Sequence, residues 1–229
     1  MYTICEMCGR YTIRRLADVA REVIGKQYDL SAFESTRFSV SPGRSVPVVR
    51  ATGPGRELAT PVWGFVPKST TSKPKFAPIN AKSETVATGW MFKYAFNERR
   101  CLMPCDGFYE PKGPSSLKKR QAYFFRRRGD LPFALAGIWE PASGIGGETC
   151  TMLTTSPNKL MMPIHDRMPV VVLKDDWTRW LDPNATGDDV ADLLRPAPDD
   201  FLETWPVLDM VEDPEGNGGY RDGVPEEWR

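Results

Sequence analysis

Three residues that lie far apart in the chain, Cys8, Glu110 and His165, have the clearest capacity for chemistry. His165 is the only histidine, so a step that needs a group titrating near neutral pH must use it, a carboxylate or an amine. Its neighbours Asp166 and Arg167 offer an orienting carboxylate and a phosphate ligand. Glu110 follows two aromatic residues, and burial beside them would raise its pKa toward the range of a general acid or base.

Cys8 gains a second nucleophile if its backbone amine is free. A terminal amine has a pKa of about 7.7 to 8.0 and a thiol one of about 8.5, so both are partly deprotonated at neutral pH. The amine forms an imine with an aldehyde, and the thiol then closes a five-membered thiazolidine ring. Met1 to Glu6 precede Met7, so this chemistry requires either initiation at Met7, which we favour, or self-cleavage of the prefix. Considered alone, a free cysteine is more commonly a small buried hydrophobe.

The composition is that of a globular protein with a sizeable core. The 229 residues are 41% hydrophobic, 11% aromatic and 26% charged. Lys plus Arg equals Asp plus Glu at 30 each, so global charge does not indicate a polyanionic partner, although basic residues are dense up to Arg128 and acidic residues after Asp182. Five cysteines without a signal peptide predict reduced thiols and a cytoplasmic protein. No apolar run is long enough to span a bilayer.

The periodicity predicts a mixed fold with many loops. Apolar residues at helical spacing predict a helix over residues 16–24, and further helices are expected at 83–97, 175–181 and 188–194. Strands are expected at residues 46–50, 61–66, 101–103, 123–127, 133–139, 149–154 and 170–173. Because Pro and Gly separate these runs, we predict a single α+β domain with a largely antiparallel sheet, covering residues 8–208 between a prefix at 1–7 and a loosely packed tail at 209–229.

Four short segments, taken together and in this order, resemble the SOS response-associated peptidase (SRAP) family. They are Met7-Cys8-Gly9-Arg10-Tyr11, Ile79-Asn80-Ala81-Lys82-Ser83-Glu84-Thr85, Gly107-Phe108-Tyr109-Glu110 and Pro163-Ile164-His165-Asp166-Arg167-Met168-Pro169. The resemblance extends through Trp63-Gly64-Phe65-Val66-Pro67 and Thr154-Thr155-Ser156-Pro157-Asn158. It implies a curved, barrel-like sheet, covalent capture of abasic sites in single-stranded DNA, and an associated self-processing peptidase activity.

The resemblance also implies roles for individual residues. It makes Cys8 the nucleophile, Glu110 and His165 the proton-transfer residues, and Asn80 a hydrogen-bonding partner of the reacting amine. DNA contacts are expected from Arg10, Pro42, Trp63, Lys82, Thr154 and Arg167, with Trp63 stacking on a base. The sequence departs from the family pattern at Lys82, where arginine is usual, and at Pro111, where tryptophan is common. No metal, organic cofactor or membrane is implied, and we expect a monomer that joins the nucleoid when it binds DNA.

Three other interpretations are compatible with the residues. Cys5, Cys8, Cys101 and Cys105 could supply four thiolates to zinc. Cys8, His165 and Asn80 could form a conventional cysteine peptidase acting on other proteins. A binder of single-stranded DNA that makes no covalent bond would use the basic residues and ignore Cys8. Metal analysis, acetylation of the amine and a detergent-resistant complex distinguish these alternatives.

Overall fold

The computed structural model describes residues 8–15, 18, 22, 39–53, 55–72, 74–113, 120–141 and 146–207. The expected prefix (1–7), the expected tail (209–229), Cys5 and nearly all of the expected helix at 16–24 lie outside the described residues. Within the described part, strands dominate and helices are short, as an α+β fold requires.

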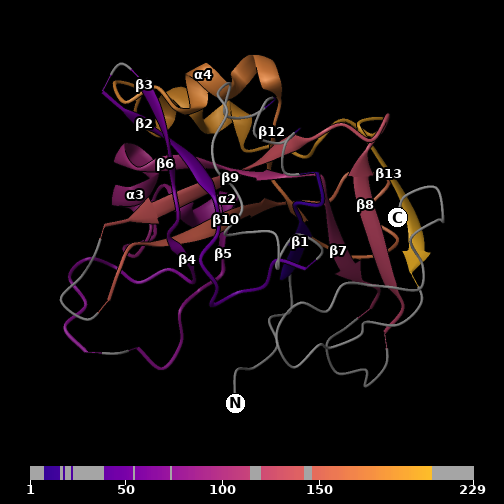
Figure 1. The fold of residues 1–229 in the computed structure, drawn as a ribbon, viewed down its shortest axis with the longest axis horizontal. Helices are drawn as coiled ribbons and strands as arrows, with labels where there is room; N and C mark the ends of the chain where they lie inside the picture. The colour runs from indigo at the N-terminus through magenta and orange to yellow at the C-terminus, as the bar shows by residue number, and fades with distance from the viewer. Residues whose placement is uncertain are drawn as a thin grey trace.

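A smaller sheet of four antiparallel strands forms one side of the molecule (Figure 1). Its order is β1 (Arg10–Thr12), β7 (Gly107–Pro111), β8 (Ala122–Arg127) and β13 (Leu202–Val207). Only β8 coincides with an expected strand. The other three are short, or contain Gly and Pro, and they form because neighbouring strands offer hydrogen-bonding partners.

The larger, curled sheet accounts for the remaining strands of the described residues. Its main path is β11 (Met168–Pro169), β10 (Thr149–Thr155), β9 (Phe133–Glu140), β6 (Arg100–Cys105), β2 (Val48–Thr52) and β3 (Gly55–Ala59). In addition, β12 (Val171–Val172) pairs with β9, while β4 (Val62–Trp63) and β5 (Asn80–Lys82) pair with β10 in parallel. The sheet is therefore largely antiparallel, as predicted, with two parallel exceptions.

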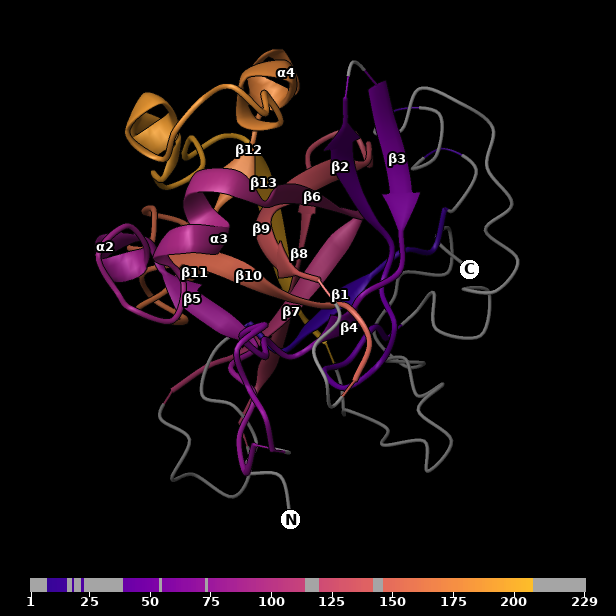
Figure 2. The same ribbon diagram turned by 90° about the vertical axis from the view of Figure 1, so that its left-hand side faces the viewer.

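The single helix expected over residues 83–97 is two helices. α2 (Ser83–Val86) ends where the amides of Thr88 and Gly89 both donate to the carbonyl of Thr85, and α3 (Lys93–Glu98) begins after a turn. The prediction was wrong here because glycine favours such a turn over a helix interior. α3 lies beside β6 and β9 (Figure 2). Farther along, the helices expected at 175–181 and 188–194 are confirmed as short helical segments: η3 (Lys174–Asp176) with α4 (Trp177–Trp180), and η4 (Asp188–Leu193).

The described part of the chain has one main apolar core, built from both sheets and the helices around them. β6 is buried along its whole length, and β9 nearly so, which explains why their sequences read as continuous apolar runs. None of the helices described is both long and apolar enough to cross a membrane.

Arg100 at the start of β6 joins the helical segments to this core. Its buried guanidinium donates to five main-chain carbonyls at 2.6–2.9 Å, contributed by Phe96, Asn97, Trp180, Asp182 and Ala185. These carbonyls lie at and beyond the ends of α3 and α4, where helices leave acceptors unsatisfied. One planar cation thus satisfies acceptors from two separate segments of the chain.

We predict that Arg100→Lys lowers the free energy of unfolding by about 3 kcal/mol, because an ammonium has three donors and leaves at least two buried carbonyls unsatisfied. Urea denaturation measures this change. Arg99→Lys is the matched control: Arg99 pairs with Glu98 and Glu140, and lysine keeps that charge, so its loss should be clearly smaller. Equal losses in the two variants would contradict the role given to Arg100.

Candidate functional site

The pairing of β1 with β7 brings Cys8 close to Glu110. In the antiparallel register, Arg10 lies opposite Tyr109 and Thr12 opposite Gly107. Cys8 precedes β1, and Glu110 follows Tyr109 on β7, so the chain direction carries both toward the same end of the strand pair. Both residues are buried.

The Glu110 carboxyl group lies in an environment that favours its protonated form. Burial raises its pKa to about 7, against the lowering effects of the Cys8 thiol and the positive charge of His165. The Cys8 amide and the charge of Arg120 lower it further, by smaller amounts. Within the described residues, these groups approach the carboxylate without completing a hydrogen bond of ordinary geometry to either oxygen. Glu110 can therefore give or take a proton near neutral pH, beside a thiol.

Cys8 has a strained backbone. Its φ of 28° lies on the positive side, which residues other than glycine rarely adopt. Its side chain and backbone amide both act on Glu110. The strained backbone therefore belongs to a residue whose main chain, as well as its thiol, approaches Glu110.

His165 lies in the segment between β10 and β11, and its side chain is mostly buried. Its Nδ1 accepts a hydrogen bond from the Arg167 amide at 3.1 Å, and the Asp166 carboxylate lies 3.1 Å from the same nitrogen. The segment is held near β7 by the Gly113 amide, which donates to the Ile164 carbonyl at 3.3 Å.

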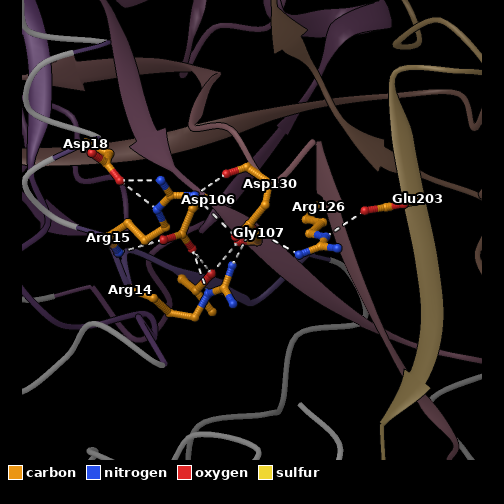
Figure 3. A network of polar contacts seen from close by, with 9 residues as sticks. Arg14, Arg15, Asp18, Asp106, Gly107, Arg126, Asp130 and Glu203 are labelled. Carbon is orange, nitrogen blue, oxygen red and sulfur yellow. Dashed lines mark hydrogen bonds and ion pairs between the residues drawn. The ribbon is translucent and has the colours of Figure 1, made fainter. Parts of the chain in front are cut away.

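At the opposite end of the β1–β7 pair, the buried carboxylate of Asp106 fixes the register (Figure 3). Its Oδ1 accepts from the Thr12 hydroxyl and, at 3.2 Å, from Arg14 Nε. Its Oδ2 accepts from the Arg15 amide at 2.8 Å. Next to it, Gly107 has no room for a side chain, because a Cβ would lie 2.2 Å from the Phe124 ring. A slip of one residue would move these contacts and the Cys8–Glu110 approach together.

A second group of site residues gathers around β10. Thr154 pairs with Lys82 on β5 and with Pro169 on β11. The guanidinium of Arg167 donates to the Thr154 carbonyl at 2.8 Å. It also donates to both carboxylate oxygens of Glu84, a residue of α2, at 2.5 and 2.8 Å. This bidentate pair lowers the pKa of Glu84 to about 2. Lys82 is exposed beside it.

Several buried polar atoms of the two groups have no hydrogen bond within the part of the chain that the structure describes. They are both carboxylate oxygens of Glu110, the hydroxyl of Thr154 and Nε of Arg167. An unsatisfied buried polar atom costs free energy, so such atoms are uncommon in an ordinary core and point to catalysis or binding. Similar atoms occur elsewhere in the described part of the chain, on Tyr11, Arg99 and Thr151, so they are compatible with a site here and do not by themselves locate it.

Three further residues expected at the site, Asn80, Arg10 and Pro42, lie in separate segments of the chain. Asn80 begins β5 opposite Met152, and Arg10 Nη1 donates to the Ser39 hydroxyl at 2.9 Å. Pro42 is half-buried in a turn whose Gly43 amide bonds to the Trp63 carbonyl.

Trp63 requires a correction. Its side chain is 0% exposed, packs against Tyr11 at 5.5 Å and donates from Nε1 to the Ile79 carbonyl at 2.8 Å. The ring therefore offers no open face on which a base could stack, and its place in the core accounts for its large apolar area.

Two of the four cysteines of the zinc interpretation are buried in the larger sheet, and Cys5 lies outside the described residues. Cys101 and Cys105 lie on β6, and burial raises the pKa of both thiols, which favours the protonated form over a thiolate ligand. Among the described residues, no three His, Cys, Asp or Glu side chains are grouped as metal ligands.

Three residues that act on the site were not expected from the sequence: Glu84, Asp106 and Arg120. Glu84 belongs to a segment that had been singled out, but its pairing with Arg167 spans 83 positions and carries no local signal. Asp106 directly precedes Gly107. Arg120 ends the basic run that begins at Lys118, and only the fold shows that its charge reaches Glu110.

Comparison with known proteins gives consistent matches over most of the chain. Residues 7–214 match the family model described as SOS response associated peptidase (SRAP). The abasic site processing protein YoaM of Bacillus subtilis is 32% identical over 221 residues, covering 92% of this chain and 95% of that protein. The abasic site processing protein YedK of Escherichia coli is 26% identical over 193 residues, covering 82% and 85%.

Solved structures show the same fold. A crystal structure of a protein from Bacteroides thetaiotaomicron superimposes with a TM-score of 0.77 at 20% identity, covering 88% of this chain and 93% of that one. A crystal structure of a protein from Bordetella bronchiseptica gives 0.72 at 26% identity, covering 88% and 100%.

We predict that Glu110→Gln stabilises the protein more at pH 8 than at pH 5. A carboxyl group whose pKa is raised in the folded state binds more protons there than in the unfolded state, so stability falls as pH rises from the ordinary value to about 7. Glutamine does not titrate. The difference in unfolding free energy between variant and wild type should therefore shift by up to about 3 kcal/mol in favour of the variant. Urea denaturation at the two pH values measures it, and an unchanged difference would contradict the buried environment.

Proposed function

The chain belongs to the SOS response associated peptidase family, and from this premise and the site's geometry we propose that it captures abasic sites in single-stranded DNA covalently through Cys8. The proposal extends to the removal of the residues before Cys8 by the same site. Relatives whose names describe abasic site processing support the choice of substrate.

The observation that carries the proposal is a carboxyl group with a pKa of about 7 against both nucleophilic atoms of one cysteine. Imine formation needs an acid to remove water, and ring closure needs a base for the thiol. A buried Glu110 near half-ionisation can perform both steps at neutral pH. A purely structural carboxylate of this burial would instead be paired, as Glu140 is with Arg99.

The proposed steps balance as follows. The free amine of Cys8 adds to the aldehyde carbon of the ring-opened deoxyribose, and the resulting carbinolamine loses one water when Glu110 protonates its hydroxyl. Loss of water leaves an iminium ion and the Glu110 carboxylate. This carboxylate takes the thiol proton, and the sulfur adds to the iminium carbon, which gives a neutral ring nitrogen and a protonated Glu110. A carbon–nitrogen and a carbon–sulfur bond form, and water is the only leaving group.

His165 is assigned proton transfer to or from the sugar that opens. Its Nδ1 lies 3.1 Å from both the Arg167 amide nitrogen and the Asp166 carboxylate, and these contacts orient the ring. Asn80, at the start of β5, is assigned the hydrogen bond that orients the amine or the ring. Both roles come from the resemblance of the segments that carry these residues.

Removal of the prefix uses the same groups. The Cys8 backbone is strained while it is amide-bonded, and cleavage of the Met7–Cys8 bond abolishes the φ that carries this strain. Water adds to the Met7 carbonyl carbon, and Glu110, which approaches both the thiol and the amide of Cys8, protonates the departing nitrogen and recovers a proton from that water. The products are the Met7 carboxyl group and the free Cys8 amine. The freed amine then lies where it attacks the aldehyde.

The second group of residues supplies the DNA contacts. Lys82 is exposed, and Arg167 lies behind it in its bidentate pair with Glu84. Lysine provides charge without the planar fork of arginine, so its phosphate contact is the less oriented of the two. Arg10 and Pro42 complete the proposed contacts, whereas the fully buried Thr154 acts through its carbonyl, which holds the Arg167 guanidinium.

A peptidase acting on other proteins is the alternative. It would rely on a thiolate beside an imidazole. In this structure the Cys8 thiol acts on the Glu110 carboxylate, an arrangement that serves proton transfer to an amine more directly. Acetylation of the Cys8 amine separates the two functions, since peptidase turnover tolerates it and DNA capture does not.

We predict that protein beginning at Cys8 gains the mass of an abasic oligonucleotide less one water. Intact-mass spectrometry after mixing measures this, and the complex should withstand boiling in detergent. Cys8→Ala removes the sulfur and should give no stable adduct. Cys101→Ala is the control, because this thiol is buried in β6 and should leave the adduct intact. A wild-type protein without adduct, or an adduct that survives Cys8→Ala, would contradict the proposal.

We predict that Glu110→Gln slows adduct formation about 100-fold or more, the usual contribution of a general acid or base. In the wild type, the rate should rise with pH as the nucleophiles lose protons and fall where Glu110 loses its own. The falling limb should vanish in the variant. Quenched time courses between pH 5 and 9 give the profile. Glu140→Gln, a buried carboxyl on β9 paired with Arg99, should keep the wild-type shape; the same change in both variants would exclude a role for Glu110.

A further inference from the structure

Two exposed aromatic side chains lie where α2 leads into α3: Trp90 in the connecting turn and Tyr94 in the first turn of α3. Trp90 is 73% exposed and Tyr94 is 59% exposed, and Lys93 Nζ lies 4.9 Å from the centre of the Tyr94 ring. We call Trp90, Lys93 and Tyr94 the corner patch. Nothing in the proposed chemistry uses it.

The core of the protein does not require these rings. The other aromatic residues of the same segment point inward: Phe92 packs on Phe65 at 5.2 Å, and Phe96 packs on Trp180 at 6.2 Å. The segment is therefore anchored by one pair of aromatics and presents the other pair outward. Large exposed rings of this kind, placed next to one another, indicate a binding surface.

The corner patch is tied through the backbone to the residues proposed to hold DNA. The Gly89 amide donates to the Thr85 carbonyl at 2.7 Å, and the Lys93 amide donates to the Gly89 carbonyl at 3.0 Å. Thr85 follows Glu84, whose carboxylate holds Arg167. With consecutive Cα atoms 3.8 Å apart, the Trp90 backbone lies within roughly 15 Å of that of Glu84. A strand of a few nucleotides spans this interval.

Charge and area favour a nucleic-acid strand over a second copy of the chain. Lys93 lies within the patch and Lys82 precedes α2, so cations occur along the path as a phosphate backbone requires. Two rings bury about 150 to 250 Å² each, well short of the roughly 1,000 Å² that a specific protein interface needs. Aromatic faces beside cations suit bases and phosphates without regard to sequence.

We propose that Trp90 and Tyr94 stack on bases of the single strand beyond the lesion, with Lys93 contacting the phosphate between them. The inference rests on the proposed function, because it takes the Arg167 side of the site as the path of the strand. It assigns the corner patch to strand affinity and excludes it from bond formation.

The test uses oligonucleotides that carry a tetrahydrofuran abasic analogue, which lacks the aldehyde and so reports binding alone. Fluorescence anisotropy compares a trinucleotide centred on the analogue with a fifteen-nucleotide strand. We expect the Trp90→Ala, Tyr94→Ala double variant to bind the long strand about 100-fold more weakly, at about tenfold per ring, and the trinucleotide as the wild type does. Trp90→Phe should retain most of the affinity that the single Trp90→Ala variant loses, because phenylalanine keeps an aromatic ring face at this position.

Phe76→Ala is the matched control, since Phe76 is 63% exposed and lies outside the patch. The proposal is overturned if the double variant binds the long strand as tightly as the wild type does. It is also overturned if Phe76→Ala weakens long-strand binding as much as the double variant does, or if the double variant loses as much affinity for the trinucleotide as for the long strand. Self-association that the double variant abolishes would assign the patch to a second copy instead. Adduct formation at saturating aldehyde-bearing strand should be unchanged in the double variant. If the wild type forms no adduct while the patch still determines strand affinity, the proposed function fails and this inference stands.

Discussion

The approach of a buried carboxyl group to one cysteine depends on the pairing of a three-residue strand, β1, with β7. Three residues contribute few ladder hydrogen bonds, so the strand needs anchoring beyond its own length. Asp106 provides this at one end by accepting from Thr12 and Arg14, and Val40 provides it along the strand by exchanging backbone hydrogen bonds with Tyr11. The position of Cys8 beside Glu110 therefore depends in part on contacts at the far end of the pair.

The larger sheet supplies the other half of the site through a single strand. β10 pairs with β9, β11, β4 and β5, and so collects segments that begin at residues 62, 80 and 168. Its C-terminal end holds Thr154 between Lys82 and Pro169. Residues that contact a substrate can differ here while β10 and its neighbours stay buried, because the strand positions them through its backbone.

The sequence predicted the elements whose own residues carry a clear strand or helix pattern. β6, β8, β9 and β10 have six to eight residues, rich in apolar or β-branched side chains, and were found. By contrast, β1, β5 and β7 have three to five residues and form because partners from distant segments meet them. Cys8, Glu110 and His165 were recognised from motifs, but the burial that raises the pKa of Glu110 belongs to the fold. The base-stacking role expected of Trp63 was wrong, because the sequence does not distinguish an exposed ring from a buried one. In the structure the Trp63 ring is buried, and its Nε1 donates a hydrogen bond to the Ile79 carbonyl. Asp106 and Glu84 were missed for the same reason: their partners lie far away in the chain.

The pair between Arg167 and Glu84 has a consequence for selectivity. Glu84 keeps its charge down to a pH of about 2, so the guanidinium fork is already occupied by an anion at any physiological pH. A phosphate that takes this place exchanges one charged partner for another and gains only the difference. Under the proposed function, phosphate contact at this fork adds little affinity for an intact strand, whereas a strand with a reactive aldehyde is held by a covalent bond that no such exchange weakens.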